Sequence, residues 1–432
     1  MPTKRVAGLT QSNGIRLNGS SYGQHMVATL IPILQAMIDP TAAEVTVDRL
    51  YDAVTGYPGF TGTGCCFDNN GMTKSGNFYQ HADGDYFFQP TDPADAEFPN
   101  FLAWPSVAGR QGLVETWMTG TVPSQLAEVS AFYIFHSEYD TQAPGVNGWI
   151  RDDPRVLERA WRRRVDRMRT VCGKTAEETP LLVVGPILFS PGSNEGFELA
   201  REAFDRLVAD RSMNAFWVGE ACLDFEWDAD TPGSYSAHAT NSDMQVMARR
   251  LAPGFARILG PRWAPNSFAA GRLYPQNGPR IGWAQRTSDT NIRCFVQHEG
   301  GGDFTLPASP TFSWRCFYGG HGLREIATIS NPQSISISTV AKVDYRTIDV
   351  TLGSACPVAD GLRIAYGWGN QRQQTGNAIV DDRTAVAHTN RVLPSNVSGG
   401  DRINGALART PARGLPVSND PPPIWAIGPA LV

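Results

Sequence analysis

The pattern of apolar and polar positions changes character at about residue 261. Before it, short continuous apolar runs alternate with stretches whose apolar residues recur every three or four positions. The runs predict buried strands and the stretches predict amphipathic helices. We expect strands at 4–9, 44–54, 129–135, 180–188 and 213–218, and helices at 22–38, 154–171, 194–210 and 242–259. This alternation predicts an α/β domain with a doubly wound parallel sheet over residues 1–260. Pro253 is expected to kink or split the last helix.

Two further segments follow different patterns. Residues 57–125 are rich in Gly, Pro, Asp and aromatics, and a long irregular insert of this kind is typical of a functional loop or lid. Residues 261–395 carry short β-branched or alternating runs, which favour an antiparallel β-sandwich domain. The strands expected there are 291–297, 311–318, 334–341, 346–352 and 361–366. Residues 396–432 are rich in Pro and Gly and are expected to form a tail over the surface or against a neighbour.

The bulk composition removes several classes of function. The 432 residues include 37 basic and 42 acidic side chains, giving a net charge of −5, so no nucleic-acid partner is expected. No apolar run reaches the roughly 20 residues that span a bilayer. The seven cysteines form no CxxC pair, so neither a zinc ribbon nor a thioredoxin motif is indicated. The first residues lack a signal-peptide core, so we expect synthesis in the cytoplasm without a signal peptide.

Three polar segments follow or precede the expected elements of the α/β domain. Ser12 and Asn13 come directly after the first strand, His136 and Glu138 after the aromatic strand, and His238 just before the last helix. Each has an ordinary alternative, as a turn residue, a polar loop start or a surface histidine. A serine nucleophile needs an adjacent base and preorganised N–H donors. All three segments fall where the ligand crevice of an α/β sheet opens.

The ordered set of segments resembles a known family. Gln11-Ser12-Asn13 resembles the GQSN block of SGNH (GDSL-type) hydrolases of the sialate O-acetylesterase and acetylxylan-esterase-like branch. Residues 134–140 resemble that branch's W-x-Q-G-E-x-D block. His238, followed by Ala-Thr-Asn and a helix, resembles its D-x-x-H-P-S/T block. The β segment resembles the accessory domain of phage and prophage members, through residues 296–301, 362–367 and 376–377.

The resemblance implies a carbohydrate O-acetylesterase that needs no metal or cofactor. Ser12 is then the nucleophile and His238 the general base. The Ser12 and Gly56 N–H groups form the oxyanion hole, with His136 as a side-chain donor. Asn13 and Glu138 support the site. Aromatic residues of the insert are expected to stack on sugar rings, with ordinary loop packing as the alternative: Tyr57, Phe60 and Tyr79.

The chain departs from the family pattern at three points. Thr10 replaces a glycine, and His136-Ser137 replace Gln-Gly, so the side-chain donor is either His136 or missing. Tyr235 stands where the family has its aspartate. Either Asp228 or Asp230 orients the imidazole, or the enzyme works as a Ser–His dyad.

Two alternatives therefore stay open. One is a catalytically weakened glycan-binding or structural virion protein on the same fold. The other is a lipase or thioesterase, which would need an apolar acyl channel that the polar insert does not suggest. The partner expected for the esterase is an acetylated bacterial polysaccharide. Other virion subunits or further copies of the chain are alternative partners of the β domain and the tail.

Overall fold

The computed structural model of the chain describes a set of segments that includes most of the expected strands and helices. They are residues 1–10, 17, 25–50, 123–135, 154–186, 194–219, 241–269, 279–298, 302–311, 313–318, 333–356, 361–369, 379–381, 407 and 409–424. Among them, no helix is long and apolar enough to cross a membrane.

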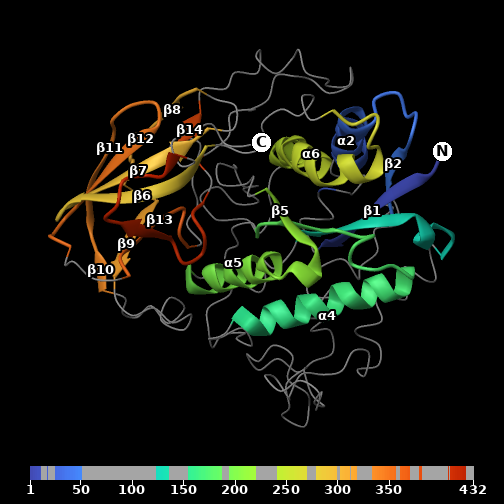
Figure 1. Ribbon diagram of the computed structural model, residues 1–432, viewed down its shortest axis with the longest axis horizontal. Helices are drawn as coiled ribbons and strands as arrows, with labels where there is room; N and C mark the ends of the chain where they lie inside the picture. Colours follow the sequence, from blue (N-terminus) through green and yellow to red (C-terminus); the bar gives the residue numbers. More distant parts are fainter. Residues whose placement is uncertain are drawn as a thin grey trace, which may run out of the picture.

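The described part of the first 260 residues forms a five-stranded sheet in the order β2-β1-β3-β4-β5 (Figure 1). Every neighbouring pair is parallel. The strands are β1 (Thr3–Thr10), β2 (Thr46–Arg49), β3 (Val129–Phe135), β4 (Leu181–Val184) and β5 (Ala215–Gly219). A parallel α/β domain is therefore confirmed.

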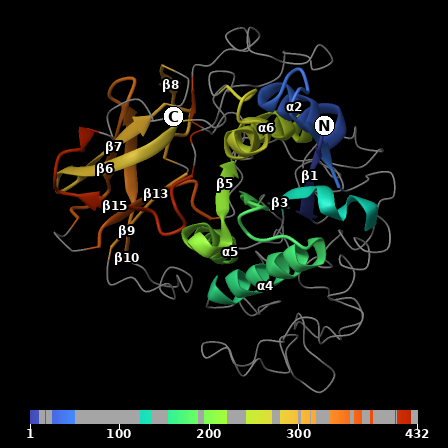
Figure 2. The same ribbon diagram turned by 45° about the vertical axis from the view of Figure 1, so that its right-hand side comes forward.

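Helices cover both faces of this sheet (Figure 2). On one face lie η2 (Met26–Leu30), α2 (Ile31–Ile38) and α6 (Asn241–Trp263). On the other lie α4 (Pro154–Cys172) and α5 (Asn194–Ala209). Short 3-10 turns, η5 (Pro123–Glu128) and η7 (Arg211–Met213), precede β3 and β5.

The alternation of side chains along β3 explains why two helical layers are needed. Tyr133 and Phe135 belong to the core under α2 and α6, while Phe132 and Ile134 belong to the core over α4 and α5. Successive residues of a strand point to opposite faces. A strand that is apolar at every position therefore has to be covered on both sides, as in parallel sheets.

Of the two outcomes expected at Pro253, a split of the helix does not occur. The helix α6 continues from Asn241 to Trp263 with Pro253 inside it. Leu251 and Phe255, on either side of the proline, are fully buried in the same core. Burial on both sides holds the helical backbone although proline removes one intrahelical hydrogen bond.

The second half of the chain forms a β domain, as expected. In its described part, eight strands pair in the order β10-β9-β13-β15-β6-β7-β12-β11, and a separate pair joins β14 to β8. The eight-stranded sheet is antiparallel except where β15 runs parallel to β6. The strands are β6 (Arg280–Ser288), β7 (Asn291–Gln297), β8 (Phe304–Thr305), β9 (Trp314–Tyr318), β10 (Gln333–Ile335), β11 (Ile337–Lys342), β12 (Thr347–Leu352), β13 (Arg363–Tyr366), β14 (Val380–Asp381) and β15 (Leu415–Ser418).

The eight-stranded sheet doubles back on itself. Its two edge strands, β10 and β11, are separated in the chain by Ser336 alone, so the expected single strand 334–341 is two strands at opposite ends of the strand order. One core cluster takes side chains from both halves, among them Cys294 of β7 and Cys316 of β9. The strand β15 lies inside the segment that the sequence predicts to be a tail, and joins the two halves through its pairs with β13 and β6.

Candidate active site

The carboxyl ends of the five parallel strands meet at one edge of the sheet, called the carboxyl edge below. The strand order reverses direction between β1 and β3, because β2 lies on one side of β1 and the later strands lie on the other. Ligands of open α/β sheets bind at such a switch point, outside the strand ends. The final residues of the two strands, Thr10 and Phe135, are direct partners across the pair.

Both ends of α6 can be placed relative to the same sheet. Arg262, in its last turn, bonds the side chain of Asn214 (3.3 Å), which directly precedes β5. Asn266, just beyond the helix, bonds the Glu44 carboxylate (3.2 Å), close before β2. The carboxyl end of α6 therefore lies at the opposite edge of the sheet, where the strands begin, which is called the amino edge below. Its amino end, at Asn241, points toward the carboxyl edge.

A close contact between β1 and β3 lies just inside the carboxyl edge. A Cβ on Gly8 would come within 2.5 Å of the Tyr133 hydroxyl oxygen, so only glycine leaves room for this phenol. Tyr133 is buried and its ring also packs against Phe255 of α6 at 5.8 Å between centroids. The floor beneath the switch point is therefore aromatic and tightly packed.

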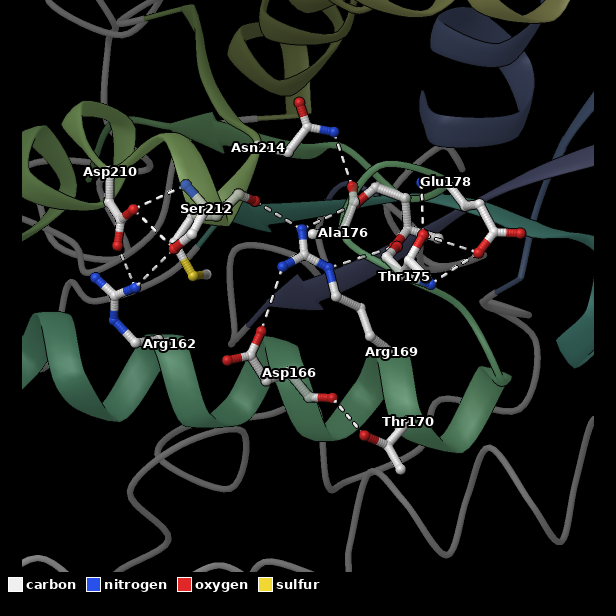
Figure 3. A network of polar contacts seen from close by, with 12 residues as sticks. Arg162, Asp166, Arg169, Thr170, Thr175, Ala176, Glu178, Asp210, Ser212 and Asn214 are labelled. Atoms are coloured by element: carbon white, nitrogen blue, oxygen red, sulfur yellow. Dashed lines mark hydrogen bonds and ion pairs between the residues drawn. The ribbon is translucent and has the colours of Figure 1, made fainter. Parts of the chain in front are cut away.

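The opposite, amino edge is fastened by a polar network around Arg169 of α4 (Figure 3). Its guanidinium donates to the carbonyl oxygens of Thr179 (3.0 Å) and Met213 (2.7 Å), which closely precede β4 and β5. Burial lowers the pKa of Arg169 below its usual range. The amide of Asn214 donates to the Ala176 carbonyl (2.8 Å). This network holds strand starts and lies at the edge away from the switch point, so its role is structural.

The sequence-predicted site residues all fall outside the described residues, so their geometry remains a prediction. They are Ser12, Asn13, Gly56, Tyr57, Phe60, Tyr79, His136, Glu138, Asp228, Asp230 and His238. What the structure does place are the elements nearest in the chain to three of them: β1 before Ser12, β3 before His136 and α6 after His238. Within the described residues, no group of three His, Cys, Asp or Glu side chains could hold a metal ion.

The sequence did not identify one buried polar pair near the carboxyl edge of the sheet. Glu198 and Arg201 of α5 form an ion pair (2.9 Å) whose side chains are 1% and 4% exposed. A Glu and an Arg three positions apart also occur on ordinary solvated helix faces. The sequence therefore carries no signal that separates this buried pair from an exposed one.

Comparison with known proteins gives little further guidance. No protein-family model matches the chain, and no curated protein matches it. Among solved structures, the chain is similar to a carbohydrate acetylesterase from Xanthomonas citri, with 14% sequence identity and a TM-score of 0.37. The match covers 59% of this chain and 48% of that one. A TM-score at this level does not define a shared fold.

Proposed function

We propose that the chain is a serine esterase of the SGNH type that removes O-acetyl groups from a carbohydrate. The observation that carries the proposal is the pairing of Thr10 with Phe135 at the switch point of a parallel sheet. This is the position from which an α/β sheet presents reactive side chains to a ligand. The two polar blocks that contain Ser12 and His136 begin directly after these residues.

Covalent geometry supports the same arrangement. One residue advances a chain by at most about 3.8 Å between Cα atoms. The Cα of Ser12 is therefore tethered within about 7.6 Å of the end of β1, and that of His136 within about 3.8 Å of the end of β3. His238 precedes Asn241, the start of α6, by three residues. The end of α6 that follows it faces the carboxyl edge, which supports the proposal that the serine and the histidine act at one rim.

The proposed reaction has two half-reactions. His238 takes the Ser12 proton while the Ser12 oxygen attacks the acetyl carbonyl, and the N–H groups of Ser12 and Gly56 stabilise the oxyanion. As the intermediate collapses to acetyl-Ser12 and the bond from the acetyl carbon to the sugar oxygen breaks, the protonated His238 gives its proton to that oxygen. In the second half, His238 takes a proton from water while the water oxygen attacks the acetyl-serine. The bond to the Ser12 oxygen then breaks, His238 returns the proton to that oxygen, and acetic acid leaves and ionises to acetate.

The first experiment is acetate release from a panel of O-acetylated bacterial surface polysaccharides. We expect Ser12→Ala and His238→Ala each to lower kcat by on the order of 10⁴-fold or more. Ser20→Ala is the matched control, because it also replaces a serine in this stretch of the chain, and it should retain activity. Covalent labelling of Ser12 by a fluorophosphonate, read by peptide mapping, identifies the nucleophile independently of the substrate.

The same assay identifies the group that orients the imidazole. Loss of an orienting acid costs on the order of 10⁴-fold in kcat in a known triad, so Asp228→Asn and Asp230→Asn are compared. If neither change matters while Ser12→Ala abolishes turnover, the enzyme is a dyad. If the native protein releases no acetate and resists the fluorophosphonate but binds the polysaccharide, the glycan-binding or structural alternative replaces the esterase.

A further inference from the structure

The strand β11 (Ile337–Lys342) forms one edge of the eight-stranded sheet. Among the described strands, β12 is the only one that pairs with it. In Figure 1, β11 lies on the side of the β domain that faces away from the helices of the α/β domain. An edge strand presents unpaired backbone N–H and C=O groups, and these can pair with a strand of another chain. The free side of β11 is therefore a candidate interaction surface.

The phase of the hydrogen bonds shows which backbone groups face this free side. The Val343 N–H donates to the Thr347 carbonyl oxygen (2.9 Å), so these two residues form a bonded pair at the end of the β11–β12 hairpin. Bonded and non-bonded pairs alternate along antiparallel strands. Going back along β11, Ala341 is therefore bonded to β12, whereas Val340 and Lys342 turn their N–H and C=O groups to the free side.

The hydrogen bonds on the other side of β12 agree with this phase. Val296 of β7 donates its N–H to the Arg346 carbonyl oxygen (2.7 Å). Two residues further along the chain, Ile348 belongs to the next bonded pair with β7. Ile348 lies opposite Lys342 of β11. A strand residue directs both of its backbone groups to the same side, so Ile348 bonds β7 and Lys342 faces the free side.

The middle of β11 lacks the features that usually protect an edge strand, which are prolines, bulges and exposed charges. The strand contains no proline, and its irregularity in register lies near its start, before Thr339. Its one charged residue, Lys342, is bound within the chain. The Nζ atom donates to the Phe304 carbonyl oxygen (2.9 Å) and pairs with Asp303 (2.5 Å). Residues 339–343 are therefore open to pairing with a further strand.

Exposed apolar side chains lie at the end of the same strand. Val343 is 47% exposed and Tyr345 is 53% exposed, and every residue from 341 to 345 is exposed. The turn that carries them is ordered, because the Asp344 carboxylate accepts a hydrogen bond from the Arg346 backbone N–H (2.7 Å). An ordered hairpin that exposes apolar side chains beside unpaired backbone groups favours pairing with a further strand.

We propose that β11 pairs antiparallel with β11 of a second copy of the chain, with the two-fold axis at Ala341, so that the two β domains share one continuous sheet. This register places Val340 of each copy opposite Lys342 of the other, which satisfies the free N–H and C=O groups of both residues. On the outer face of the sheet, Ala341 meets Ala341 of the other copy and Thr339 lies opposite Val343. Cross-strand pairs of β-branched residues stabilise neighbouring strands.

The charges along this pairing are compatible with a second copy. Lys342 lies opposite an apolar residue and is already paired with Asp303. Asp344 lies opposite Ser338 of the other copy. Over the paired positions, no two like charges therefore face each other. The same surface serves as both partners of a two-fold contact only if it is self-complementary, and this edge meets that condition in its hydrogen bonds, its side chains and its charges.

The test is the mass of the full chain in solution over a concentration series, measured by sedimentation velocity. A strand pair of this length makes a small interface, so the native protein should pass from a monomer of 47.0 kDa to a dimer between about 1 and 100 µM. Ala341→Glu places two like charges at the axis and should raise the dissociation constant about tenfold or more. Ala355→Glu, at an exposed alanine just after β12, is the matched control and should dimerise like the native protein.

Opposite charges at the same position identify the symmetric pairing. Ala341→Lys should also lose the dimer on its own. An equimolar mixture of Ala341→Lys and Ala341→Glu should recover it, because the two charges then attract each other across the axis. Amide hydrogen exchange of the native protein gives an independent result. The N–H groups of Val340 and Lys342 should become protected as the dimer forms, while that of Ala341, already bonded to β12, should not change.

Recovery of the mixed dimer, together with protection at Val340 and Lys342, supports the proposal. A native chain that stays monomeric over the whole concentration range overturns it. So does a dimer that Ala341→Glu leaves intact, or a mixture of the two charged variants that stays monomeric while circular dichroism shows both to be folded. The result is independent of the esterase proposal, since no measurement here requires turnover.

Discussion

At the scale of single residues, Arg169 shows how one buried cation fixes the starts of two strands. Its side chain is 4% exposed and satisfies the carbonyl oxygens of Thr179 and Met213. A buried carbonyl that loses its donor costs about 1–3 kcal/mol. The arginine therefore stabilises the connections into β4 and β5 rather than any reacting group.

Replacing Arg169 with methionine should lower the free energy of unfolding by about 3 kcal/mol, because both carbonyls lose their donor. Arg162→Met is the matched control on the same helix. Arg162 bonds Glu158 (2.8 Å) and Asp210, and its side chain is 22% exposed. Partly exposed pairs contribute up to about 1 kcal/mol. Urea unfolding followed by circular dichroism measures both. Equal losses would contradict the role assigned to Arg169.

At the scale of elements, the turn from α2 into β2 depends on Asp39, which is fully buried. Its carboxylate accepts from the backbone N–H groups of Glu44 (2.6 Å) and Val45 (3.0 Å). Burial alone would raise the pKa of Asp39, but the hydrogen bonds from the turn and from Ser267 outweigh it and hold this pKa below its usual range. The ionised form is therefore favoured by folding.

Asp39→Asn should destabilise the protein in a pH-dependent way. A carboxyl whose pKa is lowered on folding contributes stability above its unfolded pKa, about 3.9, and loses it as the pH falls through the folded value. The difference in unfolding free energy between native protein and variant should be full above about pH 5 and should shrink below pH 4. Urea titrations at several pH values test this. Asp420→Asn, at an exposed position, is the control, and a gap that does not depend on pH would contradict the assignment.

Elements also show where periodicity stops being informative. The runs 129–135 and 291–297 predicted β3 and β7 at their exact bounds. The run 334–341 looks like one strand, yet it supplies β10 and β11 to different partners. The strand β15 contains Pro416 and pairs over only two positions on each side, so it leaves no alternating pattern to read.

At the scale of the whole molecule, one core of the α/β domain and the core of the β domain bury thiols on different elements. Cys172, Cys294, Cys316 and Cys356 are all buried. Burial raises the pKa of Cys172 and of Cys316 to about 12, and it raises that of Cys294 as well. The thiolate is the reactive form, so these side chains are inert in the folded protein.

Iodoacetamide at pH 8.5 should therefore leave Cys172, Cys294 and Cys316 unmodified in the native protein and label them once urea unfolds it. Peptide mapping by mass spectrometry gives the result for each thiol. Because these pKa values are raised on folding, their contribution to stability is full below the unfolded pKa of about 8.5 and is lost as the pH rises toward 12. Rapid labelling of the native protein would contradict the burial.

The sequence by itself determined the local elements and the two-part architecture, because apolar periodicity and strand–helix alternation depend on residues that are close together in the chain. It also contains the polar segments in which Ser12 is proposed as the nucleophile and His238 as the general base. Only the tertiary structure decided what those segments are attached to. Three features depend on residues far apart in the chain: the pairing of Thr10 with Phe135, the return of the β sheet at Ser336, and the hydrogen bond from the Gly369 backbone N–H to Glu198. Contacts of that kind depend on packing between elements, which no local pattern encodes.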